Sequence, residues 1–191
     1  DNVVIIVDEV INIVAVDVVN SVVIVNIVVV DVFPVDVVVN NVFVYVVVVV
    51  VYVVVIIDVF RATSTIASAL YNGAKCVIPV DSVPKAIDIS KNIGGIAAGE
   101  RDGMIAEGLQ HGNSPLEYTR EFIENKTLVL TTTNGTRLLQ MALDRNADMI
   151  ISGSFPNLSA VCDFLLAEKK NVVLGCAGWK DRFNLEDTLF A

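Results

Sequence analysis

Charged and hydroxyl side chains follow an apolar run that ends near Ile57. Asp58 comes first, Arg61 follows three residues later, and Thr63 and Ser64 stand where the pattern predicts the start of a helix. A helix N-terminus offers unpaired N–H groups and a partial positive charge, which suit an anion. A carboxylate beside them also suits a divalent cation. The plainer alternative is that Thr63 or Ser64 only caps the helix.

A second polar cluster follows a small-residue run at 95–99. Glu100 and Arg101 lie between glycines, which allow a tight turn that points charged groups into a cleft. Asn113 and Ser114 come later in the same stretch, and we count both as candidate substrate-binding residues. An ordinary surface turn is the alternative.

A third cluster lies between a predicted strand at 127–131 and a predicted helix. Hydroxyls, an amide, a glycine and a cation are poor core material but suit the binding of a phosphate or a sulfonate. A polar turn without a ligand is again the alternative. The residues of this cluster are Thr132, Thr133, Asn134, Gly135, Thr136 and Arg137.

The C-terminal stretch carries two weaker signals. Glu186 and Asp187 are carboxylates that could hold a metal, although acids in a first helical turn also simply favour the helix dipole. Cys176 and Arg182 have the Cys-x5-Arg spacing of the thiol phosphatases, in which a thiolate attacks phosphate. We keep this thiolate mechanism as a minor alternative.

The elements that must position these clusters alternate between strands and helices from residue 56 onward. This order predicts an α/β protein with three layers, α/β/α, around a mostly parallel sheet, and it leaves mixed pairing open. Ligands bind at the carboxyl ends of the strands in such sheets, where the polar clusters stand. Expected strands end at 57 and cover 76–80, 95–99, 127–131, 148–154 and 171–178; expected helices cover 62–73, 82–93, 114–125, 137–146 and 158–170, with another beginning at 184.

The first 55 residues differ in composition from the rest of the chain. They contain 30 Val and no Gly, Lys or Arg. Such runs lack the turn residues that let strands fold back, so we treat 1–55 as a low-complexity segment of doubtful sequence that leads into the first strand. Residues 56–191 form the informative α/β domain. A membrane-tethered domain that uses 42–57 as its anchor is an alternative, but this apolar stretch is shorter than the roughly 20 residues that span a bilayer.

Overall charge restricts the possible partners. With 13 Lys and Arg against 22 Asp and Glu, the net charge is −9, which argues against a nucleic-acid binder. Three widely spaced cysteines fit a reducing compartment, so we expect a cytoplasmic protein with no membrane partner. The sequence leaves open whether copies of the chain form a homo-oligomer.

The successive motifs resemble those of the 2-phosphosulfolactate phosphatase family over residues 54–191. The segments that carry the resemblance are VIIDVFRATSTIASALYNGAK, AGERDG, GNSPLEYT, KTLVLTTTNGTRLL, ISGSFPNLSAV and RFNLEDTL. The resemblance does not extend over 1–53. The family continues past the EDTL motif, so it also implies that a C-terminal part is missing here.

This resemblance implies a Mg²⁺-dependent hydrolase that converts (R)-2-phospho-3-sulfolactate to 3-sulfolactate and phosphate, a step toward coenzyme M. A non-catalytic α/β anion-binding domain is the alternative. The substrate carries three anionic groups, for which Arg61, Arg101 and Arg137 are candidate partners. We expect Asp58, Arg61, Glu100 and Arg137 to be catalytic, and the metal-ligand candidates are Asp58, Glu100, Glu186 and Asp187. Because Phe60 replaces the second acid of a haloacid-dehalogenase DxD motif, we favour Asp58 as metal ligand over nucleophile, without excluding the latter.

Overall fold

The computed structural model describes residues 12–19, 22–28, 35–39, 42–46, 52–145, 147–179 and 182–191. The chain divides into two units, Asp1–Val51 and Tyr52–Ala191, close to the change in composition. In the first unit, β1 (Asn12–Val19) pairs with β2 (Val22–Val28), and β3 (Val35–Val39) with β4 (Val42–Val46), both antiparallel. The other residues of the Val-rich segment up to Val51 lie outside the described part.

The apolar stretch at 42–57 is extended where it is described. It contains β4 and β5 (Tyr52–Ile57). Within the described residues, no helix has the length and apolar character needed to cross a membrane.

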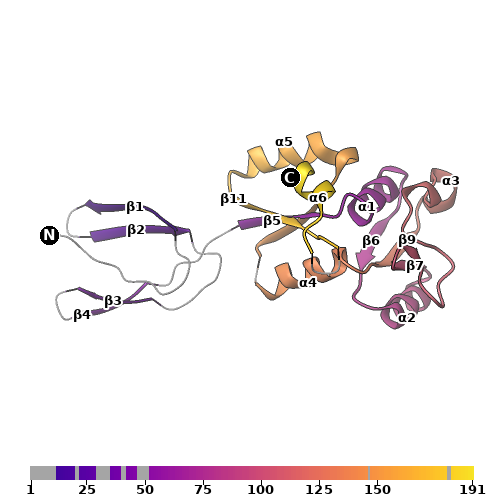
Figure 1. Cartoon of the computed structure of the whole chain (residues 1–191), viewed down its shortest axis with the longest axis horizontal. Coiled ribbons are helices and arrows are strands. Elements are labelled where there is room, and N and C mark those ends of the chain that lie inside the picture. The colour runs from indigo at the N-terminus through magenta and orange to yellow at the C-terminus, as the bar shows by residue number, and fades with distance from the viewer. Residues whose placement is uncertain are drawn as a thin grey trace. The chain divides into compact units, whose positions relative to one another are not determined.

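In the second unit, β5 is a fully buried parallel strand between two others. It pairs with β10 (Met149–Gly153) and β11 (Asn171–Cys176). Helices α5 (Leu158–Glu168) and α6 (Leu185–Phe190) pack on the face that carries Val55 and Ile57, and α4 (Gly135–Asp144) lies on the other face (Figure 1). Coverage of both faces explains why the strand is a continuous apolar run rather than an alternating one.

A second group of strands extends the sheet layer. β6 (Cys76–Pro79), β9 (Thr127–Thr131) and β7 (Ile96–Arg101) are parallel, and β8 (Met104–Ile105) is antiparallel to β7. Residues of α1 (Ala62–Tyr71) and α3 (Arg120–Ile123) share a core with β9, and α2 (Val83–Ile93) packs on β7 and β9. The predicted three-layer α/β fold with a mostly parallel sheet is therefore confirmed, with mixed pairing at β8.

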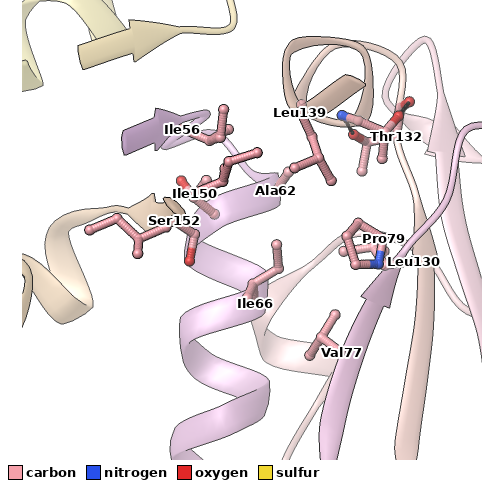
Figure 2. Close-up of a pocket in the computed structure, with 14 residues that line it drawn as sticks. Ile56, Ala62, Ile66, Val77, Pro79, Leu130, Thr132, Leu139, Ile150 and Ser152 are labelled. Atoms are coloured by element: carbon pink, nitrogen blue, oxygen red, sulfur yellow. Dashed lines mark hydrogen bonds between the residues drawn. The ribbon is translucent and has the colours of Figure 1, made fainter. Parts of the chain in front are cut away.

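The described strands of the second unit form two hydrogen-bonded groups, although the sequence predicted one sheet. An apolar cavity of about 240 Å³ lies between Ile150 of β10 and Val77 and Pro79 of β6 (Figure 2). β6 is only four residues long and ends at Pro79, which has no N–H to donate to a neighbouring strand. Ile66 of α1 and Leu139 of α4 also line this space, so side chains rather than ladder hydrogen bonds join the two groups.

The helix predicted from Ser114 to about residue 125 was wrong. The structure instead has a 3-10 turn at Pro115–Glu117 followed by the short α3, and the Ser114 side chain makes no capping bond. The Glu117 carboxylate accepts a hydrogen bond from the N–H of Gly112 (2.8 Å) rather than folding back as a cap. Tyr118 follows the 3-10 turn in a non-helical conformation; it is fully buried and donates its hydroxyl to the Gly112 carbonyl.

Candidate active site

A polar hollow of about 110 Å³ lies at the carboxyl ends of strands from both groups. Asp58 enters it directly after β5, Glu100 from the end of β7, and Thr133 two residues after the end of β9. The described residues that line it are Asp58, Phe60, Arg61, Glu100, Asp102, Gly103, Asn113, Thr133, Asn134 and Trp179. Six of the residues predicted from the sequence are thus brought together: Asp58, Arg61, Glu100, Asn113, Thr133 and Asn134.

Asp58 is held by the start of α1. The N–H of Ala62 donates to its Oδ1 (3.3 Å), and its own N–H donates to the Thr63 hydroxyl (3.2 Å). Only 8% of its surface is exposed. The carboxylate therefore has a defined orientation at the floor of the hollow.

Gly135 lets the loop after β9 approach this carboxylate. A Cβ at this position would lie 2.9 Å from Asp58 Oδ2 and 3.1 Å from the Cβ of Ala62. The N–H of Gly135 also faces the Asp58 carboxylate and opposes the rise of its pKa. Gly135, predicted as a substrate-binding residue, is needed here because any side chain would displace Asp58 or α4.

Glu100 is held by two backbone amides from different loops. Its Oε1 accepts from the N–H of Thr133 (2.8 Å) and its Oε2 from the N–H of Gly103 (2.8 Å). Gly103 has a φ of +81°, a conformation that L side chains rarely adopt, so the β7–β8 turn depends on glycine there. Glu100 thereby joins the β7–β8 turn to the loop after β9.

Asp187 is close enough to Asp58 for its charge to act on it, but it does not line the hollow. It is 1% exposed, and its Oδ1 accepts from the N–H of Val59 (2.9 Å). Its Oδ2 accepts from the side chain of Asn184 (2.9 Å), whose Oδ1 in turn caps α6 by accepting from the N–H of Asp187 (3.0 Å). Asp187 connects α6 to the Asp58 loop.

Negative charge is concentrated around Asp58. Burial, with smaller contributions from the neighbouring charges of Asp187 and Glu100, raises the pKa of Asp58 from 3.8 to about 6, although the N–H groups of Ala62 and Gly135 oppose the shift. A carboxylate with a raised pKa in a polar hollow is typical of a functional site. A bound cation would reduce the repulsion among these carboxylates.

The amides predicted to bind a phosphate already bind the protein's own carboxylates. Those of Ala62 and Gly135 face Asp58, and that of Thr133 faces Glu100. The hydroxyls of Thr132 and Thr136 are engaged inside the loop, where Thr132 Oγ1 accepts from the N–H of Thr136 (3.3 Å) and Thr136 Oγ1 donates to the Thr132 carbonyl (2.7 Å). The N-termini of α1 and α4 therefore face the Asp58 carboxylate, and the loop before α4 holds Glu100.

Arg61 is the one cationic side chain among the described residues that line the hollow. Its Nη2 donates to the Gly103 carbonyl (3.1 Å), which holds the guanidinium at the mouth. The remaining donors of the guanidinium fork suit a planar or tetrahedral oxyanion.

Several predicted residues lie elsewhere. Thr63, Thr132, Gly135 and Thr136 line the apolar cavity of Figure 2. Arg101 bonds to Thr131 Oγ1 (2.9 Å) and the Glu100 carbonyl (2.6 Å), and Ser64 donates to the Val59 carbonyl (2.7 Å). None of Arg101, Ser64, Ser114, Arg137 and Glu186 lines the hollow, and Arg137 and Glu186 are exposed.

Four residues that line the hollow are absent from the predicted set. Asp102 and Gly103 belong to the charged turn after 95–99, so the glycine-flanked pattern could have indicated them. Phe60 and Trp179 are 70% and 56% exposed and form an aromatic rim. Nothing in the spacing of two distant aromatics predicts that they face one hollow.

The thiolate alternative is not supported by the position of Cys176. Its Sγ lies 3.6 Å from the Asp187 carbonyl, to which it donates, and it does not line the hollow. Burial and then the charge of Asp187 raise the pKa of the Cys176 thiol, which opposes formation of a nucleophilic thiolate.

The donor set fits a hard divalent cation that keeps part of its water shell. Within the described part of the chain, no three His, Cys, Asp or Glu side chains converge tightly enough to hold a metal alone. Asp58 and Glu100 do line the hollow together, and the buried Oδ1 of Asn113 there has no hydrogen-bond partner. Mg²⁺ is commonly bound by one or two carboxylates, with neutral oxygens and water completing the octahedron.

Fold and site together define an α/β protein whose polar site is built from loops at the carboxyl ends of parallel strands. The family model for 2-phosphosulpholactate phosphatase matches residues 48–191. The chain belongs to this family.

Curated relatives support this assignment. A protein of Thermotoga maritima named "probable 2-phosphosulfolactate phosphatase" is 49% identical over 136 residues, which cover 71% of this chain and 58% of the relative. Relatives of the same name from Caldanaerobacter subterraneus and Clostridium perfringens are 45% and 41% identical, again over 71% of this chain and over 57% and 56% of theirs. The chain thus spans somewhat more than half the length of the curated relatives that it matches.

Proposed function

We propose that this chain carries the active site of a Mg²⁺-dependent phosphatase that hydrolyses the phosphate monoester of a small anionic acid. The proposed substrate is (R)-2-phospho-3-sulfolactate, after the family and its named members. The observation that carries the proposal is the hollow in which Asp58 and Glu100 face Arg61. Family membership favours this function over a non-catalytic anion-binding domain.

The charges of the hollow explain why a cation is needed. A phosphate dianion would be repelled by Asp58, Glu100 and Asp102 unless positive charge lay between them. We assign Asp58 and Glu100 as the carboxylates that hold Mg²⁺. When bound, this ion would neutralise charge on the phosphate and lower the pKa of a bound water.

The protein's own groups have separate roles in this proposal. Arg61, held by the Gly103 carbonyl, binds a non-bridging phosphate oxygen and orients the ester. Phe60 and Trp179 at the rim limit the access of water to the bound phosphate. Asp58 acts as a ligand rather than as a nucleophile, because N–H groups of Ala62 and Gly135 fix its carboxylate against the floor.

The test is release of inorganic phosphate from (R)-2-phospho-3-sulfolactate, with Mg²⁺ and with EDTA. We expect release only with Mg²⁺, and slower release from 2-phospholactate, which lacks the sulfonate. The Thermotoga maritima relative is assayed in parallel for comparison. Binding of the substrate without any release would favour the anion-binding domain instead.

Lysine substitutions at Arg61 and Arg137 test which of these two arginines binds the substrate. Arg61→Lys keeps the charge but loses the planar fork, so we expect kcat/KM to fall by about 10- to 100-fold, or roughly 1.5–3 kcal/mol. Arg137→Lys, on the exposed side of α4, is expected to change kcat/KM by less than about threefold. Steady-state kinetics of both variants check this, and a larger loss in Arg137→Lys would move the anion site to the loop after β9.

The proposed setting is the cytoplasm, in a step toward coenzyme M. Cys76, Cys162 and Cys176 are all unpaired thiols, which suits a reducing compartment.

A further inference from the structure

Two buried oxygen atoms in the described part of the chain lack a hydrogen-bond partner, and both belong to residues of the hollow. They are Oδ1 of Asn113 and Oγ1 of Thr133. An unsatisfied buried polar atom costs roughly 1–3 kcal/mol, so native proteins rarely keep one without a reason. The coincidence of both atoms with one hollow points to an occupant that satisfies them.

The surroundings of Asn113 indicate what that occupant is. The residue is 4% exposed, and the acidic residues of the same hollow, Asp58 and Glu100, present carboxylate oxygens. Carboxylates and an amide oxygen are all electron-pair donors, so a group placed among them must be electropositive. A phosphate oxygen in that position would be repelled by each of them.

The backbone of Asn113 is fixed by its neighbours in the fold. Its carbonyl accepts from the buried Thr65 hydroxyl of α1 (3.1 Å). The preceding residue, Gly112, is held by Glu117 through its N–H and by Tyr118 through its carbonyl. Asn113 is therefore positioned before any ligand arrives, as a preorganised ligand requires.

We propose that Asn113 Oδ1 is a neutral ligand of the divalent cation, beside the carboxylates of Asp58 and Glu100. This inference rests on the cation of the proposed function and assigns it a further residue. An amide adds an oxygen donor without a further negative charge in a hollow that already holds Asp58, Glu100 and Asp102. It replaces Glu186 and Asp187, neither of which lines the hollow, in the ligand set expected from the sequence.

The test measures Mn²⁺ binding, by calorimetry and by electron paramagnetic resonance, in the parent chain and in Asn113→Leu and Asn113→Asp. We expect Asn113→Leu, which keeps the shape, to raise the Kd for Mn²⁺ at least tenfold. Asn113→Asp should bind Mn²⁺ at least as tightly as the parent, because it keeps an oxygen at this place.

Thermal unfolding of the metal-free protein distinguishes a ligand from a structural residue. Asn113→Leu should not lower the Tm, since it removes a buried acceptor that has no partner. Asn113→Asp should lower it by adding a carboxylate near Asp58. The matched control is Asn72→Leu: Asn72 Nδ2 donates to the Tyr118 carbonyl (2.8 Å), so its loss should lower the Tm and leave the Kd for Mn²⁺ unchanged.

Three results would overturn the assignment of Asn113. One is a Kd for Mn²⁺ in Asn113→Leu within twofold of the parent. Another is a lower Tm of that variant at unchanged Mn²⁺ affinity. The third is weaker binding of inorganic phosphate at unchanged Mn²⁺ affinity, which would mean that the amide faces an anion.

Failure of the proposed function gives a different pattern. If the parent binds no Mn²⁺, both the proposed cation and its Asn113 ligand are wrong. If the binding series behaves as expected but phosphosulfolactate is not hydrolysed, the substrate is wrong and the ligand assignment stands.

Discussion

Asp58→Asn is expected to abolish phosphate release while the fold is retained. The amide keeps the volume and can still accept from the Ala62 N–H, but it removes the charge that the proposed cation needs. Loss of a metal ligand at a reacting phosphate costs about 4 kcal/mol or more, which is at least a 1000-fold fall in kcat. Stopped assays of phosphate release with saturating Mg²⁺ measure this directly.

Asp163→Asn is the matched control for that substitution. Asp163 is exposed on α5, so the same chemical change there should leave kcat within twofold of the parent. Circular dichroism establishes that both variants keep the α/β fold. A kcat for Asp58→Asn within tenfold of the parent would remove Asp58 from the catalytic machinery.

Asp58→Asn is also expected to stabilise the metal-free protein at neutral pH but not near pH 4. Burial, together with the charges of Asp187 and Glu100, raises the pKa of Asp58 from 3.8 to about 6 in the folded state. The folded protein therefore binds this proton more tightly than the unfolded chain does. As the pH rises from about 4 to 6, the Asp58 carboxyl group therefore lowers the free energy of unfolding. Above pH 6 this destabilisation is constant at up to about 3 kcal/mol.

Removing the carboxylate should remove this pH dependence. Near pH 4 the parent and Asp58→Asn should be similar in stability, whereas at pH 7.5 in EDTA the variant should be more stable by about 1–3 kcal/mol. The lower figure applies if the new amide conflicts with the Gly135 N–H. Urea unfolding at the two pH values measures both differences.

Magnesium provides the internal control for the pH prediction. Saturating Mg²⁺ should stabilise the parent more than the variant, because the cation offsets the charge of Asp58 and adds binding energy to the folded state. The raised pKa would be contradicted if Asp58→Asn were less stable than the parent at pH 7.5 in EDTA and if this loss of stability were larger at pH 7.5 than at pH 4.

Local patterns in the sequence were sufficient to predict the alternating elements and the layers of the second unit. The apolar run that ends at Ile57 predicted a buried strand, and β5 is buried along its whole length. The run at 127–131 predicted β9 with the bounds that the structure shows. Because parallel strands bring their carboxyl ends to one edge, the positions of Asp58, Glu100 and Asn134 also predicted that they would meet. These features depend on periodicity and connectivity, which are properties of neighbouring residues.

Only the tertiary structure decided which partner each polar group has. The loop at 132–136 has the composition of an anion site, yet its Thr133 amide binds Glu100 and its Gly135 amide faces Asp58. Likewise, no local pattern shows that the side-chain oxygen of Asn113 is buried without a partner while its backbone carbonyl accepts from Thr65 of α1. A hydrogen-bond donor is satisfied by whichever acceptor the fold brings within about 3 Å, and residues 33 positions apart, such as Glu100 and Thr133, have no local signal of that proximity.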